Sequence, residues 1–343
     1  MRAMQLVSDR EVSVVDIPEP DAPGPGEVQL RIRVVALNHL DVWGWRGMAF
    51  AKRKLPLVVG AEASAEVVAL GEGVSGIVPG QLVAIYGAQT CGTCKECRAG
   101  RDNHCRHVRG VHGFHLDGFA RDLVNMPARL CVPAPAGASD MDAALTPVTF
   151  GTVEHMLFDN AVLEPGETIL VQAGGSGIGT AAIQLAKAIG CRVITTVGSD
   201  DKIDPAKALG ADEVINYRKD RFEGVVRKLT RKQGVDVVFE HVGKDTWAGS
   251  LLSLRPGGRL VSCGSTSGVS AETNLMMLFQ RQLRLIGSFG CRMANMTHSM
   301  DKMARGLARP VIDTEPEFGD IAGALARMEG RKVFGKIVMR LSD

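Results

Sequence analysis

The sequence predicts an α/β protein with two domains, a β-rich domain followed by a doubly wound parallel sheet, and three observations support this fold class. The chain has 343 residues, and at about 150 residues per domain that length predicts two cores. Its first part consists of short β segments broken by Gly and Pro, such as Val28–Val34, where apolar and polar residues alternate. After Gly151, apolar runs such as Thr168–Val171 and Arg192–Val197 alternate with helical segments, which is typical of a parallel sheet covered on both faces.

The change of pattern also predicts the domain boundaries. Residues 1–150 form the first domain, with a cysteine-containing lobe at about 89–107, and residues 151–289 form the second. After about Ser288 the alternation stops, and the chain closes on a strand-like segment, Val333–Met339. We therefore expect residues 290–343 to return to the first domain.

The composition excludes several classes of function. The chain has 40 Lys and Arg against 38 Asp and Glu, a formal charge of +2, so nucleic acid is not an expected partner. No stretch approaches about 18 uninterrupted apolar residues, so no membrane partner is expected, and Met1–Arg10 lacks the apolar core of a signal peptide. These features predict a cytoplasmic protein that acts on a small molecule.

Four of the eight cysteines are concentrated in one short segment. They have the spacing C-x2-C-x2-C-x7-C at Cys91, Cys94, Cys97 and Cys105, and four thiolates this close in sequence can surround one tetrahedral Zn²⁺. The alternatives are reduced free thiols, two disulfides, or a redox CxxC motif, which is disfavoured because no helix pattern begins at the second cysteine. All four ligands are protein sulfur, so we expect one structural zinc per chain.

A glycine-rich turn lies between an apolar strand and an apolar helix. The segment Gly174–Gly179 follows Thr168–Val171 and leads into a helical segment. Such a turn presents backbone N–H groups, and the helix N-terminus favours a pyrophosphate, so this context predicts a dinucleotide-binding Rossmann domain. The turn residues expected to bind the cofactor are Gly174, Ser176, Gly177 and Ile178.

The end of the second strand of this domain bears on the choice of cofactor. NAD enzymes usually carry an acidic residue there, whereas this chain has Gly198 and Ser199. Ser199, Lys202 and Tyr217 are suited to a 2′-phosphate, so we expect NADPH rather than NADH. Two neighbouring acids, Asp200 and Asp201, would repel that phosphate if they pointed inward; the alternative is a helix N-cap pair that faces solvent.

Together the cysteine lobe and the nucleotide-binding half resemble the medium-chain dehydrogenase/reductase superfamily over nearly the whole chain. The resemblance implies a GroES-like catalytic domain with an inserted Rossmann domain, and a homodimer or homotetramer. The strings that carry it are Gly60-Ala61-Glu62, Gly71-Glu72-Gly73-Val74, Gly80-Gln81-Leu82-Val83, Leu163-Glu164-Pro165-Gly166-Glu167 and Gly210-Ala211-Asp212-Glu213-Val214-Ile215-Asn216-Tyr217.

The sequence departs from the alcohol dehydrogenases of that superfamily at the catalytic zinc. The positions that match the two thiolates and the imidazole of the metal site are Asn38, Thr149 and Ala61, none of which binds zinc well. A substitute site at His39 and Asp41 is the less favoured alternative. The resemblance therefore implies one zinc, and that zinc is structural.

Without a Lewis acid, a simple carbonyl is harder to reduce than an alkene conjugated to a carbonyl. This points to the quinone oxidoreductases and the enoyl-CoA reductases, and three strings resemble the crotonyl-CoA and acryloyl-CoA reductases: Asn38–Trp43, Val235–Gly243 and Gly264–Gly268. The matching catalytic residues are Asn38, His241, and His115 in place of a Glu. The alternatives to catalysis are a turn or backbone-satisfying role for Asn38, a packing role for His241 and a solvated loop position for His115.

The family geometry also implies further positions in the nucleotide groove and a role for Glu62. The groove positions are Thr152, Val242, Gly264, Ser265, Thr266, Ser288 and Phe289. Glu62 is expected to connect the two domains through an arginine, and the alternative is a role as an acid in the chemistry.

The expected function is therefore an NADPH-dependent reductase of carbonyl-conjugated double bonds, in an enoyl-CoA, an enone or a quinone. The alternatives are a zinc-type alcohol or aldehyde dehydrogenase and a nucleotide-binding protein without turnover.

Overall fold

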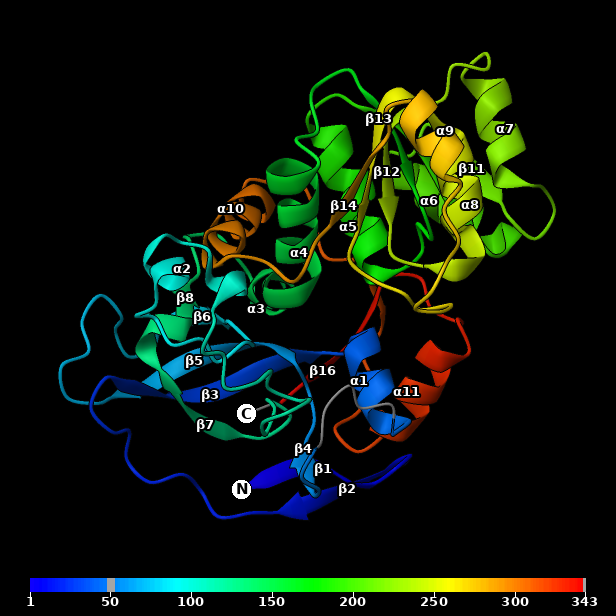
Figure 1. Ribbon diagram of the computed structural model, residues 1–343. Helices are drawn as coiled ribbons and strands as arrows, with labels where there is room; N and C mark the ends of the chain where they lie inside the picture. Colours follow the sequence, from blue (N-terminus) through cyan, green and yellow to red (C-terminus); the bar gives the residue numbers. More distant parts are fainter. Residues whose placement is uncertain (48–52, 342–343) are drawn as a thin grey trace. The chain divides into compact units, whose positions relative to one another are not determined.

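A computed structural model describes residues 1–47 and 53–341 of the chain. It divides into two compact units (Figure 1). Unit 1 comprises Met1–Gly151, Cys291–Gly306 and the residues from Ile312 onward, and unit 2 comprises Thr152–Gly290 and Leu307–Val311. The chain therefore crosses into unit 2 after Gly151, and a short segment of unit 2 interrupts its return to unit 1.

Unit 1 is built on two sheets. A three-stranded sheet has the order β2-β1-β4, and a larger sheet has the order β15-β16-β3-β5-β6-β8, with β7 also paired to β3. Its strands are β1 (Arg2–Ser8), β2 (Glu11–Asp16), β3 (Glu27–Ala36), β4 (Leu57–Val58), β5 (Glu62–Leu70), β6 (Leu82–Ile85), β7 (Leu123–Pro127), β8 (Cys131–Pro133), β15 (Ile312–Thr314) and β16 (Lys336–Arg340), and its α-helices are α1 (His39–Trp45), α2 (Lys95–Arg98), α3 (Asp140–Ala144), α10 (Met293–Ala304) and α11 (Ile321–Glu329).

The central strand β3 explains why unit 1 needs both ends of the chain. Its apolar side chains Val28, Leu30, Ile32 and Val34 are all buried, as the alternating sequence predicts. Its carboxyl end pairs antiparallel with β5 on one side and with β16 on the other. A strand from the C-terminal part of the chain thus completes the sheet that the N-terminal part begins.

Unit 2 is a six-stranded sheet in which every neighbouring pair of strands is parallel. The strand order is β11-β10-β9-β12-β13-β14. The strands are β9 (Thr168–Val171), β10 (Arg192–Val197), β11 (Glu213–Asn216), β12 (Val235–Glu240), β13 (Leu254–Ser262) and β14 (Arg284–Gly287), and the α-helices are α4 (Gly151–Glu154), α5 (Gly177–Ala188), α6 (Ile203–Ala208), α7 (Phe222–Leu229), α8 (Lys244–Ser253) and α9 (Leu275–Gln280).

This order indicates where a ligand is expected in unit 2. The chain builds outward from β9 through β10 to β11, then returns to β12 on the other side of β9. In such doubly wound sheets the crevice lies outside the carboxyl ends of the strands at this reversal. The loops that follow β9 and β12 contain the glycine-rich turn and His241, so the topology brings two predicted groups to the same place.

Three short 3₁₀-helical segments lie between these elements, and two π-helical segments flank α4, one before it and one after it. The former are Asp102–His104, Ala128–Leu130 and Asp200–Lys202, and the latter are Thr146–Phe150 and His155–Asn160. The segment Thr146–Phe150 bears on function, because the backbone N–H groups of Val148 and Thr149 donate to a buried carboxylate described below.

Candidate metal site and cofactor-binding site

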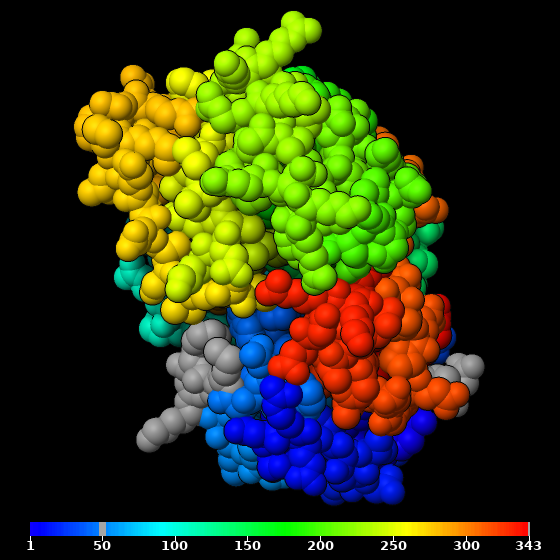
Figure 2. Space-filling model, turned by 90° about the vertical axis from the view of Figure 1, so that its right-hand side faces the viewer, coloured from blue at the N-terminus to red at the C-terminus, as the bar shows by residue number. Residues whose placement is uncertain are grey.

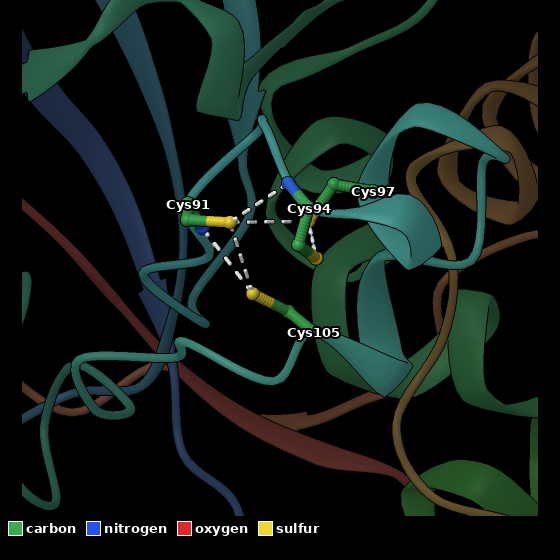
Figure 3. A group of neighbouring side chains, drawn as sticks. All are labelled: Cys91, Cys94, Cys97 and Cys105. Carbon is green, nitrogen blue, oxygen red and sulfur yellow. Dashed lines mark hydrogen bonds between the residues drawn. The ribbon is translucent and has the colours of Figure 1, made fainter.

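The four cysteines of the lobe converge on one point (Figure 3). Their sulfur atoms all lie within 4.8 Å of one another. Adjacent sulfur atoms are 3.5 Å apart for Cys94 and Cys97, 3.6 Å for Cys105 and Cys91, and 4.0 Å for Cys91 and Cys97. A tetrahedron with Zn–S distances of about 2.3 Å has edges of about 3.8 Å, so the donor set fits one zinc ion.

Backbone N–H groups of the lobe donate hydrogen bonds to two of the sulfur atoms. The N–H of Cys94 donates to Cys91 Sγ at 3.3 Å, and the N–H of His107 donates to Cys105 Sγ at 3.4 Å. Backbone N–H groups of Thr93 and Cys94 lower the pKa of Cys91 to about 5, whereas burial raises the pKa of Cys97 to about 12. A Zn²⁺ ion would hold all four as thiolates.

One expectation about the lobe is wrong in detail. A helix does begin directly after the second cysteine, because Cys94 is the N-cap residue of the four-residue helix α2. The spacing concealed it, since one helical turn carries too few residues to show a period. The redox interpretation is still disfavoured, because four sulfur atoms converge rather than two. In the described part of the chain, no other group of three or more His, Cys, Asp or Glu side chains has metal-binding geometry.

The carboxylate of Glu62 organises the second cluster of unit 1. It is fully buried, and its Oε1 accepts backbone N–H groups from Val148 at 2.8 Å and Thr149 at 2.6 Å. Its Oε2 accepts from Asn38 Nδ2 at 3.0 Å, Thr149 Oγ1 at 2.9 Å and Lys336 Nζ at 3.0 Å. We call Asn38, Glu62, Thr149 and Lys336 the Glu62 network.

The network corrects the expected role of Glu62. Its ionic partner is Lys336 rather than an arginine, and all members of the network belong to unit 1. The expectation failed because the partner lies 274 residues away on β16, a distance over which no spacing rule applies. The pair is enclosed on all sides, and several hydrogen bonds satisfy the carboxylate, the condition under which a buried ion pair is tolerated.

The network also engages two of the three positions that match catalytic zinc ligands in the alcohol dehydrogenases. Asn38 Nδ2 donates to Glu62 and to the carbonyl of Ala36 at 3.2 Å, and Asn38 Oδ1 accepts from Lys336 at 2.7 Å. Both ends of the amide are therefore occupied, as is the hydroxyl of Thr149. This arrangement gives Asn38 a structural role, and its predicted catalytic role stays a prediction.

In unit 2 the glycine-rich turn has the form that a pyrophosphate requires. Ser176 is the N-cap of α5, with its hydroxyl accepting the N–H of Gly179 at 2.9 Å. A Cβ on Gly174 would lie 2.2 Å from Thr195 Oγ1, and one on Gly179 would lie 2.3 Å from the carbonyl oxygen of Ala173. Side chains are excluded at both positions, so the turn packs closely against β10 while α5 presents its free N–H groups.

His241 lies beside this turn. Its Nε2 is 2.9 Å from the carbonyl oxygen of Gln172 and 3.3 Å from Ser176 Oγ. Burial lowers the pKa of the imidazole, so the ring is neutral and carries its proton on Nε2, where the carbonyl accepts it. The geometry makes His241 a residue that positions the glycine turn, and its catalytic role stays a prediction.

Sequence reasoning missed a buried polar network next to His241. Gln172 Nε2 donates to Ser250 Oγ at 3.0 Å, and Ser250 Oγ donates to Glu240 Oε2 at 2.6 Å. Thr196 Oγ1 donates to Gln172 Oε1 at 2.7 Å and accepts the N–H of Ala173 at 3.0 Å. These bonds fix the carboxyl ends of β9, β10 and β12. The sequence signal was the presence of polar residues at the ends of apolar strands.

The predicted phosphate-binding residues lie at the ends of β10 and β11. A Cβ on Gly198 would lie 2.5 Å from the hydroxyl of Tyr217, so the two positions adjoin. Asp200 accepts from Asn216 Nδ2 at 2.7 Å and forms an ion pair with Lys219, which lowers its pKa. The N-cap position is held by Ser199, so this part of the alternative is wrong, whereas Asp200 and Asp201 are both exposed, as the alternative expects.

The remaining predicted residues lie in loops and at strand ends, except Thr152, which lies in α4. Thr266 Oγ1 donates to the carbonyl of His241 at 3.3 Å, and a Cβ on Gly264 would lie 2.8 Å from that same oxygen. Ser288 Oγ accepts from Asn160 at 3.0 Å. His115 is half-buried in unit 1. The others are Thr152, which is buried, Val242 and Ser265, which are half-buried, and Phe289, which is exposed.

The fold and these sites define an oxidoreductase with a separate nucleotide-binding unit, and comparison with known proteins identifies the family. Residues 24–136 match the family model of the alcohol dehydrogenase GroES-like domain, and residues 177–307 match that of the zinc-binding dehydrogenase. An acryloyl-coenzyme A reductase from Metallosphaera sedula is 31% identical over 99% of each chain. The chain therefore belongs to the medium-chain dehydrogenase/reductase superfamily, as the motifs predicted.

Two further relatives show the range of activities among similar chains. A quinone oxidoreductase from Pseudomonas aeruginosa is 29% identical, with 94% of this chain and 93% of the relative covered. A crystal structure described as an NAD-dependent alcohol dehydrogenase is 38% identical over the whole of both chains, with a TM-score of 0.93. Within residues 1–47 and 53–341, we find no helix with the length and apolar character needed to cross a membrane.

The cysteine lobe generates a prediction about metal content. Purified protein should contain one zinc per chain by elemental analysis, and Cys94→Ser should remove it because three sulfur ligands hold the ion less tightly. Cys263→Ala, which removes a thiol outside the lobe, should retain the zinc. Two tightly bound zinc ions per chain would contradict a single four-thiolate site.

The Glu62 network generates a prediction about stability. Lys336→Met leaves the carboxylate buried without its cation and should lower the free energy of unfolding by about 3–5 kcal/mol in urea titrations. Combining it with Glu62→Gln, which removes the charge, should recover part of that loss. Lys332→Met, at an exposed lysine four residues earlier, should change stability by less than about 0.5 kcal/mol. Full stability of Lys336→Met alone would show that the ion pair is unimportant.

Proposed function

We propose that this protein is an NADPH-dependent reductase of double bonds conjugated to a carbonyl, in an enoyl-CoA, an enone or a quinone. The observation that carries the proposal is the Glu62 network. Asn38 and Thr149, which match zinc ligands of the alcohol dehydrogenases, are both hydrogen-bonded to Glu62, and Lys336 supplies the cation beside them. The third matching position is Ala61, which has no donor atom.

Without a catalytic metal, the proposed reaction depends on hydrogen-bond donors of the protein. Bound NADPH supplies a hydride, and a conjugated alkene accepts it at the β-carbon while negative charge develops on the carbonyl oxygen. A hydrogen-bond donor must stabilise that charge. His115 is suited to this role, because its Nδ1 accepts the N–H of Val111 at 3.2 Å, which places the ring proton on Nε2. His241 holds the glycine turn that binds the cofactor.

The preference for NADPH is the finer part of the proposal. Ser199, Lys202 and Tyr217 follow the ends of β10 and β11, where an acid would bind the ribose hydroxyls of NAD. The pairing of Asp200 with Lys219 supports it, since that carboxylate has its own cation. The NAD-dependent relative favours the opposite choice, so the two cofactors have to be compared directly.

The assembly we propose is a homodimer formed at the edge of the unit 2 sheet. The strand β14 is the last in the order and has no neighbour on its outer side within the described residues. Three apolar side chains of α9, namely Leu275, Met276 and Phe279, are exposed, and so is Leu285 on β14. The segment from α9 to β14 lies at the surface of unit 2 and is coloured yellow to orange in Figure 2. An unpaired strand beside apolar surface favours pairing with a second copy of the chain.

The reaction is tested with a panel of quinones, 2-enals, enones and short enoyl-CoA esters together with NADPH. We expect reduction of at least one class, and His115→Ala should lower kcat by about 10²–10³-fold because it removes one donor to the developing oxyanion. NADPH affinity should not change. His298→Ala, at an exposed histidine on α10, is the control. Reversible oxidation of simple alcohols with no alkene reduction would overturn the proposal.

The cofactor preference is tested by titrating NADPH and NADH against the quenching of intrinsic protein fluorescence. NADPH should bind more tightly by about 1.5–3 kcal/mol through a charge-assisted contact. Lys202→Ala should narrow that difference, whereas Lys207→Ala, at an exposed lysine of α6, should leave it as it is. Equal affinities in the parent protein would mean that an acid faces the ribose.

A further inference from the structure

One segment of unit 2 carries a large excess of positive charge. Arg218–Lys232, which contains α7, has seven Lys and Arg against two Asp and Glu. The whole chain has an excess of only two cations, so the residues outside this segment together have an excess of three acids. Such a local excess of cations attracts negatively charged groups.

Most of these cations have no carboxylate partner within residues 1–47 and 53–341. Two of the seven form ion pairs, Arg221 with Glu223 and Lys219 with Asp200. The cations without an ion pair in this part of the chain are Arg218, Arg227, Lys228, Arg231 and Lys232. Their charge is therefore not neutralised by the described residues of the chain itself.

A groove runs beside these cations on the surface of unit 2. The helix α7 lies next to α8 (Figure 1), and a groove of about 400 Å³ is lined by Arg221, Glu223, Gly224, Arg227 and Leu252, which we call the α7 groove. A Cβ on Gly224 would have no atom within 4 Å apart from its neighbours in the helix, and Leu252 is 39% exposed. The groove is therefore open to solvent and has an apolar side chain beside its arginines.

A further arginine lies close to Arg227. Burial and the charge of Arg227 both lower the pKa of Arg281. The side chain of Arg281 is held by a hydrogen bond from its Nη2 to the carbonyl oxygen of Leu254. Two guanidinium groups that repel each other are both stabilised by an anion bound near them.

The basic end of α7 lies away from the crevice expected to bind the cofactor. Lys232 comes shortly before β12, Leu252 before β13 and Arg281 before β14. These positions are at the amino ends of the strands, whereas the crevice of a doubly wound sheet lies outside the carboxyl ends. A molecule bound here is therefore neither the cofactor nor the compound that is reduced.

We propose that the α7 groove binds a short acidic segment of a partner protein, with an apolar side chain of that segment against Leu252. From Arg221 to Arg231 the cations extend over about 15 Å at 1.5 Å per residue, a length that about five residues of extended chain match. A single phosphate group covers too little of this distance. A membrane or a nucleic acid would also meet the residues outside the segment, whose acidic excess repels an extended polyanion.

The first test measures fluorescence anisotropy with two short labelled peptides, which have either a leucine or a glycine between two runs of glutamate. Both should bind the parent protein, the leucine peptide several-fold more tightly, and added salt should weaken both. The triple variant Arg227→Gln, Lys228→Gln, Arg231→Gln should bind both peptides about 10–100-fold more weakly, because each exposed charge pair contributes about 2–5-fold. Equal affinity of this variant and the parent would overturn the proposal.

A matched control removes the same charge from other parts of the surface. The triple variant Arg31→Gln, Arg98→Gln, Lys207→Gln changes three exposed cations outside the segment. It should bind both peptides within about two-fold of the parent, since long-range attraction is screened by salt. A loss as large as that of the α7 variant would mean that net charge alone attracts the peptide, which would overturn the assignment to the α7 groove.

The second test fills the groove without removing a charge. Gly224→Leu places a side chain in the open space above α7 and replaces glycine with a better helix former. It should reduce the affinity for the leucine peptide to that for the glycine peptide, and leave the glycine peptide unaffected. Unchanged affinity for the leucine peptide would overturn the contact of an apolar side chain with Leu252.

Other anions and a second copy of the chain are tested in the same way. Phosphatidylserine vesicles, inorganic phosphate and the unlabelled protein itself each replace the peptides. Binding of the vesicles or of phosphate that is lost in the triple α7 variant, with no binding of either peptide, would assign the cations to those anions and overturn the proposal. Self-association lost in that variant, again without peptide binding, would assign the groove to a second copy and overturn it as well.

Discussion

The ion pair between Glu62 and Lys336 is the interaction on which unit 1 depends. A carboxylate with no exposure to water has to be satisfied completely. Glu62 accepts hydrogen bonds from the N-cap residue of α1, from the π-helical segment after α3 and from β16. These segments come from the two ends of unit 1. The network therefore closes the sheet and fixes the helix that begins at His39. It also bears on the chemistry, because Asn38 and Thr149, which occupy positions of zinc ligands in the alcohol dehydrogenases, are both hydrogen-bonded to Glu62.

Unit 2 uses the same principle at its own carboxylate. Glu240 is buried and accepts hydrogen bonds from the N–H groups of Val242 and Gly243, from Thr246 and from Ser250. The polar chain that continues through Gln172 holds the strand ends at the reversal of the sheet. Such satisfied networks are rigid, so the glycine turn and His241 are held in place before a cofactor arrives. Each unit thus contains a buried glutamate, Glu62 or Glu240, whose carboxylate is hydrogen-bonded on both oxygens. Each glutamate lies next to residues of the predicted site.

The sequence could predict what depends on short spacing and could not predict what depends on distant pairing. The four cysteines lie within 15 residues, and the glycine turn spans six. Local spacing is therefore enough to predict both features. The six-stranded sheet followed from alternating apolar runs. The partner of Glu62 could not be predicted, because Lys336 is far away in sequence and an arginine was the family expectation. Asp200 was equally ambiguous until Asn216 and Lys219 were placed beside it.

The most direct measurement follows the hydride. The protein used is a preparation in which elemental analysis finds one zinc ion per chain. It is mixed with the enone 3-penten-2-one and with NADPH that carries deuterium at the transferable position of C4. The product is then examined by NMR. If Asn38 and Thr149 are held by Glu62 and Lys336 as described, the proposed alkene reduction gives 2-pentanone with deuterium on C4, the former β-carbon. Deuterium on the carbinol carbon of 3-penten-2-ol would show that the carbonyl itself is reduced, and would contradict this assignment.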